Sequence, residues 1–416
     1  MIQPSINWFF PYKEEVTGSN PVAPTRVFMD KNIFVTAFQA MPNKGSENYV
    51  GFYVINTLIN EGYNVHLYTP LLNQVEIRNY FQDDLPKNLF FPKVEDSYML
   101  KIFKPDPLRY SQYISNIFWE INIKTYLKYN DFEYDLYYHI NPSSWWAYNG
   151  MINNASPVLI GPLMGYRFPR KGLWSYLKFK SIIFELIRLI ILKSPYALFN
   201  KRKIIKSPSY VLIDGEKNIF NIDKYTNVSH TLSGVDTHKN RVKPEIPKVI
   251  LSGRFVDIKG YPIALKCLKG IEKDFIIEIY GSGPQEQNIN KLIKKYNLED
   301  KTIFKGYVNT RNLRTAMSSA NVFVAPYIRE NASLMVSEAL YAGLPVVTIS
   351  DTGPSSVCSF FNSSLSKISE GNRDVLIENL KNDIEYYLDN FFIEDPKPAS
   401  DFGKDILKKV DKIINE

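Results

Sequence analysis

Residues 321–349, NVFVAPYIRENASLMVSEALYAGLPVVTI, decide the fold of this chain. The apolar run Val322–Ala325 has the length of a buried strand, and Val346–Ile349 begins another. Between them Ser333 is a predicted helix N-cap, because its hydroxyl can accept a hydrogen bond from the first helical turn. Apolar residues then recur at helical spacing until Gly343, which is suited to end a helix. The stretch therefore predicts a strand, an acidic turn, a short helix and a second strand.

Two glutamates accompany this predicted helix. Glu330 lies just before its start and Glu338 lies inside it, about 7 Å apart along the axis at roughly 1.5 Å rise per residue. A helix N-terminus carries unpaired N–H groups and a partial positive charge, which suits a diphosphate. This spacing lets one carboxylate hold sugar hydroxyls while the other holds ribose hydroxyls. Two ordinary surface glutamates would explain the pattern equally well.

Two further stretches favour the first interpretation. Residues 250–260, ILSGRFVDIKG, and residues 276–284, IIEIYGSGP, each run from an apolar strand into a glycine-bearing turn. Together with 321–349 they resemble, in order and spacing, the C-terminal domain of the GT-B retaining glycosyltransferases of family 4, the glycosyl transferases group 1. The resemblance covers about residues 248–358. It implies an α/β fold of two Rossmann-like domains that face a cleft.

The resemblance also implies roles for individual residues. Arg254 offers paired donors to a diphosphate and Lys259 adds a mobile charge, although surface salt bridges are the alternative for both. Glu330 would hold the donor sugar and Glu338 the ribose. The other residues that it implies for donor binding are Gly45, Gly253, Gly281, Gly283, Tyr307, Val308, Asn331, Ser333 and Leu334.

The expected donor is a UDP-sugar or a GDP-sugar, and no cofactor or metal is expected. Asp-x-Asp, the metal motif of the other major glycosyltransferase fold, does not occur in the sequence. Two cations and a helix N-terminus can do the electrostatic work of a metal. Family members often carry Gly-Phe-Gly after the first glutamate, whereas this chain has Asn331, Ala332 and Ser333. The identity of the donor sugar therefore stays open.

The first half of the chain shows the pattern of another α/β domain. Residues 32–38 read as a buried strand, and a loop that contains Gly45 leads to a helix over Ser46–Glu61. His139 follows a further predicted strand at its carboxyl end, where open α/β sheets place ligands, and residues 141–146 are expected to begin a helix. The resemblance implies that His139 acts near the sugar. A histidine buried and bonded to backbone is the alternative.

The domain boundaries follow from these patterns. Residues 1–28 are expected to be a disordered or non-native extension, and 29–237 the acceptor-side domain. The polar, proline-bearing residues 238–247 form a predicted linker to the donor-binding domain at 248–395. By the resemblance, a C-terminal helix within 396–416 packs back on the first domain.

The most charged segment is 167–206. It carries eleven Lys and Arg against one acid, a net +10, whereas the chain of 416 residues carries only +7. Large apolar residues are interleaved with the charges, which predicts a helix at the surface of an anionic membrane, at about 1 kcal/mol per basic residue near the headgroups. A core-facing helix with a solvated basic face is the alternative. A nucleic-acid partner is not expected, because no nucleic-acid motif accompanies the charge.

The composition limits the remaining possibilities. No apolar run reaches the roughly 18 residues that a membrane-spanning helix needs, and Cys267 and Cys358 suggest neither a disulfide framework nor a zinc site. We therefore expect a cytoplasmic, retaining hexosyltransferase, peripheral at the inner membrane face, that acts on an envelope glycan or a lipid-linked acceptor. A sugar-nucleotide epimerase, a phosphorylase or a non-catalytic nucleotide- or glycan-binding protein are the alternatives.

Overall fold

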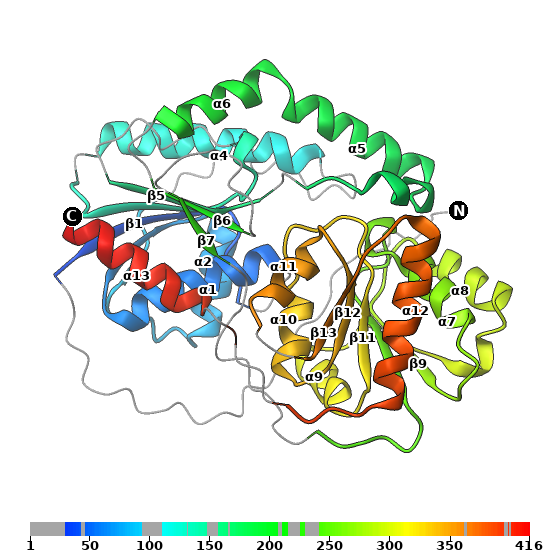
Figure 1. The fold of residues 1–416 in the computed structure, drawn as a ribbon. Coiled ribbons are helices and arrows are strands. Elements are labelled where there is room, and N and C mark those ends of the chain that lie inside the picture. The colour runs from blue at the N-terminus through cyan, green and yellow to red at the C-terminus, as the bar shows by residue number, and fades with distance from the viewer. Residues whose placement is uncertain are drawn as a thin grey trace, which may run out of the picture.

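The computed structural model of this chain contains two parallel sheets, each in its own domain (Figure 1). The residues that it describes are 30–42, 46–93, 110–130, 132–147, 157–164, 167–206, 210–214, 225–228, 241–361, 364–394, 398 and 401–416. The predicted extension at 1–28 and Gly45 lie outside the described residues. The α/β class and the two-domain arrangement that the sequence predicts are confirmed.

The sheet of the second domain has the strand order β10-β9-β8-β11-β12-β13. Its strands are β8 (Lys248–Ser252), β9 (Ile276–Tyr280), β10 (Thr302–Gly306), β11 (Val322–Ala325), β12 (Val346–Ile349) and β13 (Ser366–Ser369). Its helices are α7 (Tyr261–Lys269), α8 (Glu286–Lys295), α9 (Thr310–Ser318), α10 (Leu334–Tyr341), α11 (Gly353–Ser359) and α12 (Arg373–Asp389). This order is that of a Rossmann sheet, in which the order of the strands along the sheet reverses between β8 and β11.

The sheet of the first domain has the order β3-β2-β1-β4-β5-β6-β7 and is also parallel. Its strands are β1 (Asn32–Ala37), β2 (Asn64–Tyr68), β3 (Leu89–Phe90), β4 (Leu136–Asn141), β5 (Val158–Leu163), β6 (Tyr210–Asp214) and β7 (Tyr225–Val228). Its helices are α1 (Ser46–Glu61), α2 (Leu71–Tyr80), α4 (Tyr110–Tyr129), α5 (Phe179–Leu192) and α6 (Pro195–Lys206). The prediction that residues 141–146 begin a helix is wrong, since within the described residues 141–147 only a 3-10 turn forms, at Trp145–Ala147.

Each sheet is buried on both faces, as parallel sheets are. In the first domain one core contains Ile55, Leu58 and Val65, and the opposite core contains Trp119 and Ile160. The second domain has the same two-sided arrangement, with separate clusters on the α7 and α10 sides of its sheet. Among the described helices, none has the length and hydropathy to cross a membrane.

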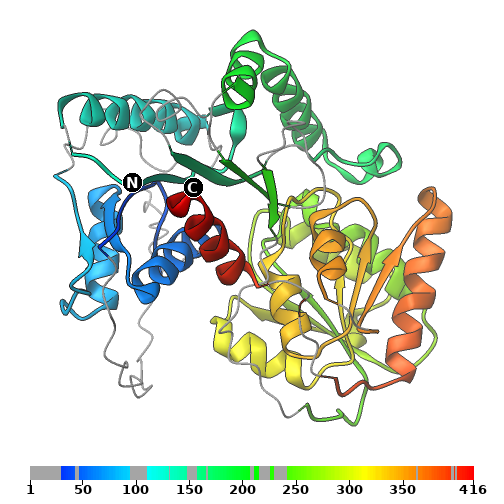
Figure 2. The ribbon, with the colours of Figure 1, turned by 60° about the vertical axis from the view of Figure 1, so that its left-hand side comes forward.

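The last helix of the chain, α13 (Phe402–Asn415), returns to the first domain (Figures 1 and 2). Its buried residues Phe402, Ile406 and Val410 belong to the core that α1 covers. Asp401 caps the helix by accepting a hydrogen bond from Lys404 N. In the described part of the chain, the second domain therefore begins after β7 and the chain is back at the first domain by α13.

The stretch 321–349 folds as its pattern predicts. β11 and β12 lie side by side in parallel register, and α10 connects them. The Ser333 hydroxyl accepts a hydrogen bond from Val336 N at 3.4 Å, so Ser333 is the N-cap. Gly343 follows the helix with φ of +70°, a backbone conformation that favours glycine.

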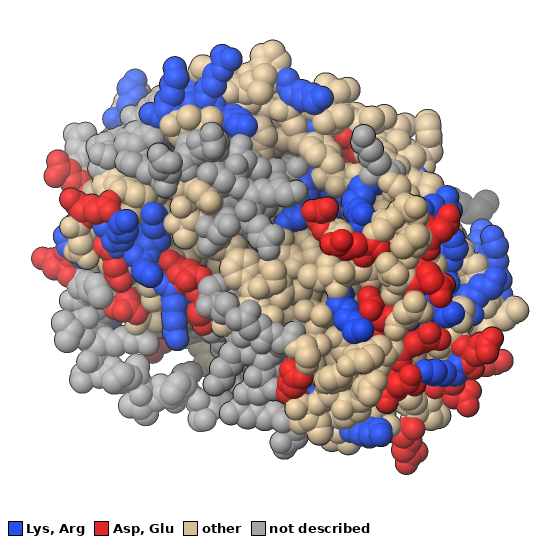
Figure 3. Space-filling model, viewed as in Figure 1, with Lys and Arg blue, Asp and Glu red and all other residues tan. Residues whose placement is uncertain are grey.

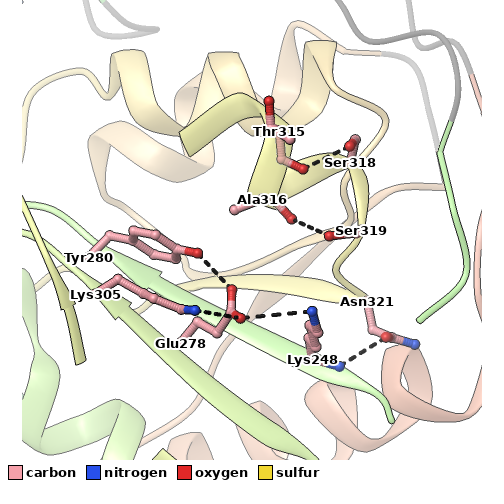
Figure 4. Close-up of polar contacts among 9 residues, drawn as sticks. All are labelled: Lys248, Glu278, Tyr280, Lys305, Thr315, Ala316, Ser318, Ser319 and Asn321. Carbon is pink, nitrogen blue, oxygen red and sulfur yellow. Dashed lines mark hydrogen bonds and ion pairs between the residues drawn. The ribbon is translucent and has the colours of Figure 1, made fainter. Parts of the chain in front are cut away.

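A buried glutamate on β9, Glu278, is paired within the second sheet (Figure 4). The Tyr280 hydroxyl donates to Glu278 at 2.7 Å, and the ammonium groups of Lys305 and Lys248 lie 3.6 and 3.8 Å from the carboxylate. Asn321, the first residue of the deciding stretch, accepts a hydrogen bond from Lys248 N. The Glu278 charge is therefore neutralised within the sheet, which is how a buried carboxylate is tolerated.

The basic segment 167–206 differs from the single helix that was expected. It forms a 3-10 turn (Lys171–Tyr176) and the two helices α5 and α6, and its first half extends over the second domain (Figures 1 and 2). We call residues 167–185 the strap. At least three of the eleven positive side chains, those of Arg167, Arg170 and Arg188, bond within the protein.

Candidate active site

The predicted donor residues gather where β8 and β11 end. All six strands of the second sheet run in the same direction, so the turns that follow them emerge at one edge. The strand order reverses between β8 and β11, which we call the reversal point. A crevice for ligands forms at such a point in open α/β sheets. The two turns that flank it touch directly, because Ile328 N donates to Ile258 O at 2.9 Å. These turns carry Lys259 and Glu330.

Lys259 and Glu330 form an ion pair across this point. Their side chains are 13% and 25% exposed, so the pair is sheltered and still reachable from solvent. The Lys259 ammonium also lies 3.9 Å from the centroid of the Tyr327 ring. The buried Tyr327 hydroxyl donates to Ser252 O at the end of β8, which fixes the ring beneath the lysine. The arrangement holds one cation and one carboxylate together at the strand ends.

The glycines of the two predicted turns pack backbone against backbone. Gly253, Gly281 and Gly283 have φ of +136°, +130° and +151°. A Cβ on Gly281 would lie 2.0 Å from Gly253 O, and a Cβ on Gly283 would lie 2.8 Å from Phe255 O. Glycine is required at both positions, because any larger residue would force the turns apart. The turns after β8 and β9 therefore form one compact unit beside Lys259.

The other residues predicted in this region lie near the same edge. Arg254 follows Gly253 directly and its side chain is exposed. After β10, Tyr307 is 61% exposed while Val308 packs partly against the core of the second domain. Both positions leave backbone or side-chain groups reachable by a nucleotide.

The start of α10 is tightly constrained. Gly353 N donates to Glu330 O at 2.9 Å, and a Cβ on Gly353 would lie 2.5 Å from the carbonyl carbon of Asn331. Leu334, the first helical residue, packs against the core of the first domain. The segment 330–334 therefore has a fixed backbone that touches both domains.

Glu338 has a partner that the sequence did not predict. Its carboxylate is paired with Arg314 of α9 at 3.2 Å, and the two side chains are 16% and 20% exposed. Burial raises the pKa of Glu338, while the charge of Arg314 and its hydrogen bond oppose that shift. On α1 of the first domain, burial raises the pKa of Tyr49, the charge of Arg314 lowers it and the charge of Glu338 raises it. Glu338 therefore lies at the boundary between the domains rather than on a free surface.

His139 is the predicted site residue whose environment differs most from expectation. It is fully buried at the end of β4, with Nδ1 2.8 Å from the Thr36 hydroxyl and Nε2 3.5 Å from the Glu120 carboxylate. Burial lowers the pKa of His139 to about 3, and a hydrogen bond with the Pro142 backbone works against that shift. His139 is thus buried, as in the alternative interpretation of the sequence, and its role near the sugar stays a prediction.

The facing edge of the first domain is organised around Asn141. Its side chain bonds both backbone groups of Gln39, accepting from N at 2.8 Å and donating to O at 2.7 Å. Glu47, at the start of α1, accepts from the backbone and hydroxyl of Ser143. These bonds join the loops after β1 and β4, which flank the reversal point of the first sheet. Among the described residues no cluster of three His, Cys, Asp or Glu side chains is placed to hold a metal ion.

Comparison with known proteins identifies the second domain. Residues 236–382 match the family model of glycosyl transferases group 1. The second domain belongs to the glycosyl transferases group 1. The Lys259 and Glu330 turns, the glycine turns and α10 all lie within this group 1 domain.

Two curated relatives match part of the chain. An uncharacterized glycosyltransferase, YqgM of Bacillus subtilis, is 27% identical over 38% of this chain and 46% of its own length. The putative colanic acid biosynthesis glycosyltransferase WcaL of Salmonella typhimurium is 28% identical over 29% of this chain and 33% of its own. The matches thus span less than half the length of these two relatives.

The fold is shared over nearly the whole chain. The solved structure of sucrose-phosphate synthase from Thermosynechococcus elongatus superposes with a TM-score of 0.59 over 92% of this chain and 95% of its own. The sequence identity is 16%, so the comparison shows the fold alone. It is the GT-B fold that the resemblance implied.

Proposed function

We propose that this protein is a retaining glycosyltransferase that moves a hexose from a UDP-sugar or GDP-sugar to an envelope glycan or a lipid-linked acceptor. The observation that carries the proposal is the Lys259–Glu330 pair at the reversal point between β8 and β11. A nucleotide diphosphate needs a cation at such a crevice, and a sugar needs an acceptor of its hydroxyl hydrogens beside it.

The proposed donor site uses the described geometry in four parts. Lys259 and the exposed Arg254 would contact the diphosphate, and the first N–H groups of α10 would add donors. Glu330 would accept hydrogen bonds from the sugar hydroxyls. Glu338, held by Arg314, would accept from the ribose hydroxyls. Backbone groups at Tyr307 and Val308 would contact the base.

The proposed reaction needs no carboxylate nucleophile. The bond between the anomeric carbon and the β-phosphate oxygen breaks, and the acceptor oxygen bonds to the same face of that carbon. The acceptor proton passes to the departing phosphate oxygen, so the products are the glycoside and the nucleoside diphosphate. Lys259, Arg254 and the α10 N-terminus would stabilise the leaving charge without a metal.

A membrane location follows from the surface of α5 and α6. Large apolar side chains are exposed along these helices, including Phe179 at 76%, Ile190 at 69% and Phe199 at 55%. Figure 3 shows lysine and arginine side chains along the same edge of the molecule. Apolar anchors with basic neighbours favour an anionic bilayer, which supports a place at the inner face of the envelope membrane and a lipid-linked acceptor. The name of the colanic acid relative supports an envelope glycan.

The transfer reaction itself tests the proposal. Purified protein is incubated with UDP- and GDP-sugars and with envelope lipid or glycan extracts, with and without a chelator. We expect acceptor-dependent sugar transfer that keeps the anomeric configuration of the donor, as read by NMR, and that survives the chelator. Turnover without an acceptor would instead indicate an epimerase, and nucleotide binding with no turnover would indicate a binding protein.

A further inference from the structure

The strap bonds to the turn that carries Lys259. The buried Asp257 carboxylate, two residues before Lys259, accepts a hydrogen bond from the Ser181 hydroxyl at 2.5 Å and one from Lys178 N at 3.2 Å. Ser181 and Lys178 belong to the first domain by sequence, whereas Asp257 belongs to the second. Unpaired, a buried carboxylate would be costly, so these two donors make the position of the turn depend on the strap.

The strap also bonds to the turn that carries Glu330. Glu185, on the inner side of α5, is 3% exposed, and its carboxylate lies 2.7 Å from Arg329 Nε. Its other oxygen lies 3.2 Å from Arg188. Arg329 directly precedes Glu330, so this ion pair restrains the backbone that carries the sugar-binding carboxylate.

Apolar packing alone would dock the strap. Leu173 and Leu177 belong to the core of the second domain, and Trp174 and Tyr176 pack against it. These contacts belong to the core on the α7 and α12 side of the sheet. Apolar packing does not require polar bonds, so the contacts of the two carboxylates serve another purpose, which is to link the strap to the two turns at the reversal point.

We propose that Glu185 and Asp257 are positioning residues that set the separation of Lys259 and Glu330 for the donor. Glu185 acts through Arg329 on the Glu330 turn, and Asp257 links the Lys259 turn to Ser181. This inference rests on the proposed function. A first-domain segment thus shapes the donor site of the second domain, and the donor affinity depends on a contact outside the ligand's reach.

The test uses Glu185→Gln, Arg329→Gln, their double variant and Ser181→Ala in the full-length protein. Each single variant is expected to raise the KM for the sugar nucleotide about fivefold with kcat within about twofold. The double variant should match the larger single effect within about twofold, because both changes break one contact. Glu378→Gln, which breaks an exposed pair with Lys381 on α12, is the matched control and should leave KM unchanged.

The outcomes separate this inference from the proposed function. An active wild-type protein whose Glu185→Gln variant keeps the wild-type KM overturns the positioning role alone. If the increases in KM of Glu185→Gln and Arg329→Gln multiply in the double variant, the two residues act independently and the positioning role is overturned as well. A lower kcat with an unchanged KM also overturns it. A wild-type protein that neither binds nucleotides nor transfers sugar overturns the proposed function, and the positioning role falls with it.

Discussion

At the scale of single residues, Glu338 shows how burial and pairing can prepare a carboxylate for a ligand. It is held by Arg314 near the boundary of the domains, where water is partly excluded. Such a carboxylate forms stronger hydrogen bonds than an exposed one, because the local dielectric is lower. Burial raises the pKa of Glu338, and the charge of Arg314 and its hydrogen bond oppose that shift. The carboxylate of the pair is therefore suited to accept hydrogen bonds from neighbouring ribose hydroxyls.

Glu338→Ala should weaken donor use strongly. A hydrogen bond to a charged group contributes about 1.5–3 kcal/mol, so kcat/KM for the sugar nucleotide should fall roughly 10- to 100-fold. The measurement is steady-state transfer at varied donor concentration. Glu299→Gln, an exposed carboxylate near β10, serves as the control and should leave transfer unchanged. A Glu338→Ala protein with the wild-type rate would contradict the assignment of this residue.

The burial of His139 should make the free energy of unfolding depend on pH. Its pKa falls from 6.5 to about 3 through burial, so the unfolded chain binds a proton that the folded protein does not bind across this interval. Stability is then fully present above pH 6.5 and declines as the pH falls toward 3. The contribution lost between pH 6.5 and pH 5 should be roughly 1.5 kcal/mol.

Thermal unfolding at pH 7 and pH 5 measures this effect in the wild type and in His139→Gln. The variant should be less stable at pH 7, but its melting temperature should fall less between the two pH values. An equal fall in both proteins would show that His139 does not carry the dependence.

The site was predictable from sequence where backbone chemistry dictates the residue. Gly281 and Gly283 lie in a turn whose backbone packs tightly against its neighbour, and Lys259 and Glu330 follow the ends of adjacent strands. Each of these residues therefore belongs to a recognisable sequence motif. Arg314 was missed because its pairing with Glu338 depends on how α9 packs against α10, and no spacing encodes that. The burial of His139 depends on Glu120 of α4, which is equally remote in the sequence.

At the scale of elements, the turn between β8 and α7 depends on one glycine. Gly260 has φ of +68°, and a Cβ on it would lie 1.9 Å from Pro326 O in the turn after β11. Gly306 has nearly the same φ, +66°, but no atom lies within 4 Å of its Cβ position. The two positions therefore differ in packing and share the same backbone conformation.

Gly260→Ala should be much more destabilising than Gly306→Ala. Gly306→Ala carries only the cost of a left-handed alanine, about 1–2 kcal/mol. Gly260→Ala must in addition separate the two turns, so its loss of unfolding free energy should be larger by about 2 kcal/mol. Denaturant unfolding of both variants gives the comparison. Equal losses would show that the Lys259 and Glu330 turns are not packed as described.

The elements of the group 1 domain were easier to predict than those of the strap. Apolar runs predicted the strands β11 and β12, and helical spacing predicted α10 between them. The structure confirms these elements. The segment 167–206 shows the same helical spacing on α5, but part of its apolar face covers the second domain. Sequence patterns report that a face is apolar and do not report which domain covers it.

At the scale of the whole molecule, the exposed face of α5 and α6 predicts membrane binding. The change Phe179→Ser with Ile190→Ser removes two anchors that are 76% and 69% exposed. The double variant should lose most of its sedimentation with vesicles that contain anionic lipid. Ile393→Ser, at a residue 72% exposed in the second domain, is the control and should bind like the wild type.

Salt and lipid composition decide whether charge contributes. Binding to anionic vesicles should weaken as salt screens the lysines, and neutral vesicles should bind less. Equal binding to both kinds of vesicle would remove the electrostatic part of this account. Loss of binding in Ile393→Ser would place the membrane surface elsewhere.

The central claim is that the diphosphate of a nucleotide binds beyond the carboxyl ends of β8 and β11, against Lys259. Calorimetric titration with UDP and UMP, and with GDP and GMP, measures it in the wild type, Lys259→Gln and Lys269→Gln. Lys269 lies over the ring of Tyr296 as Lys259 lies over Tyr327, but on α7, so it is the matched control. The account predicts that one diphosphate binds at least about tenfold more tightly than its monophosphate, that Lys259→Gln removes this advantage, and that Lys269→Gln keeps it. Binding of a diphosphate that is unchanged in Lys259→Gln, or no binding of either nucleotide to the wild type, would contradict it.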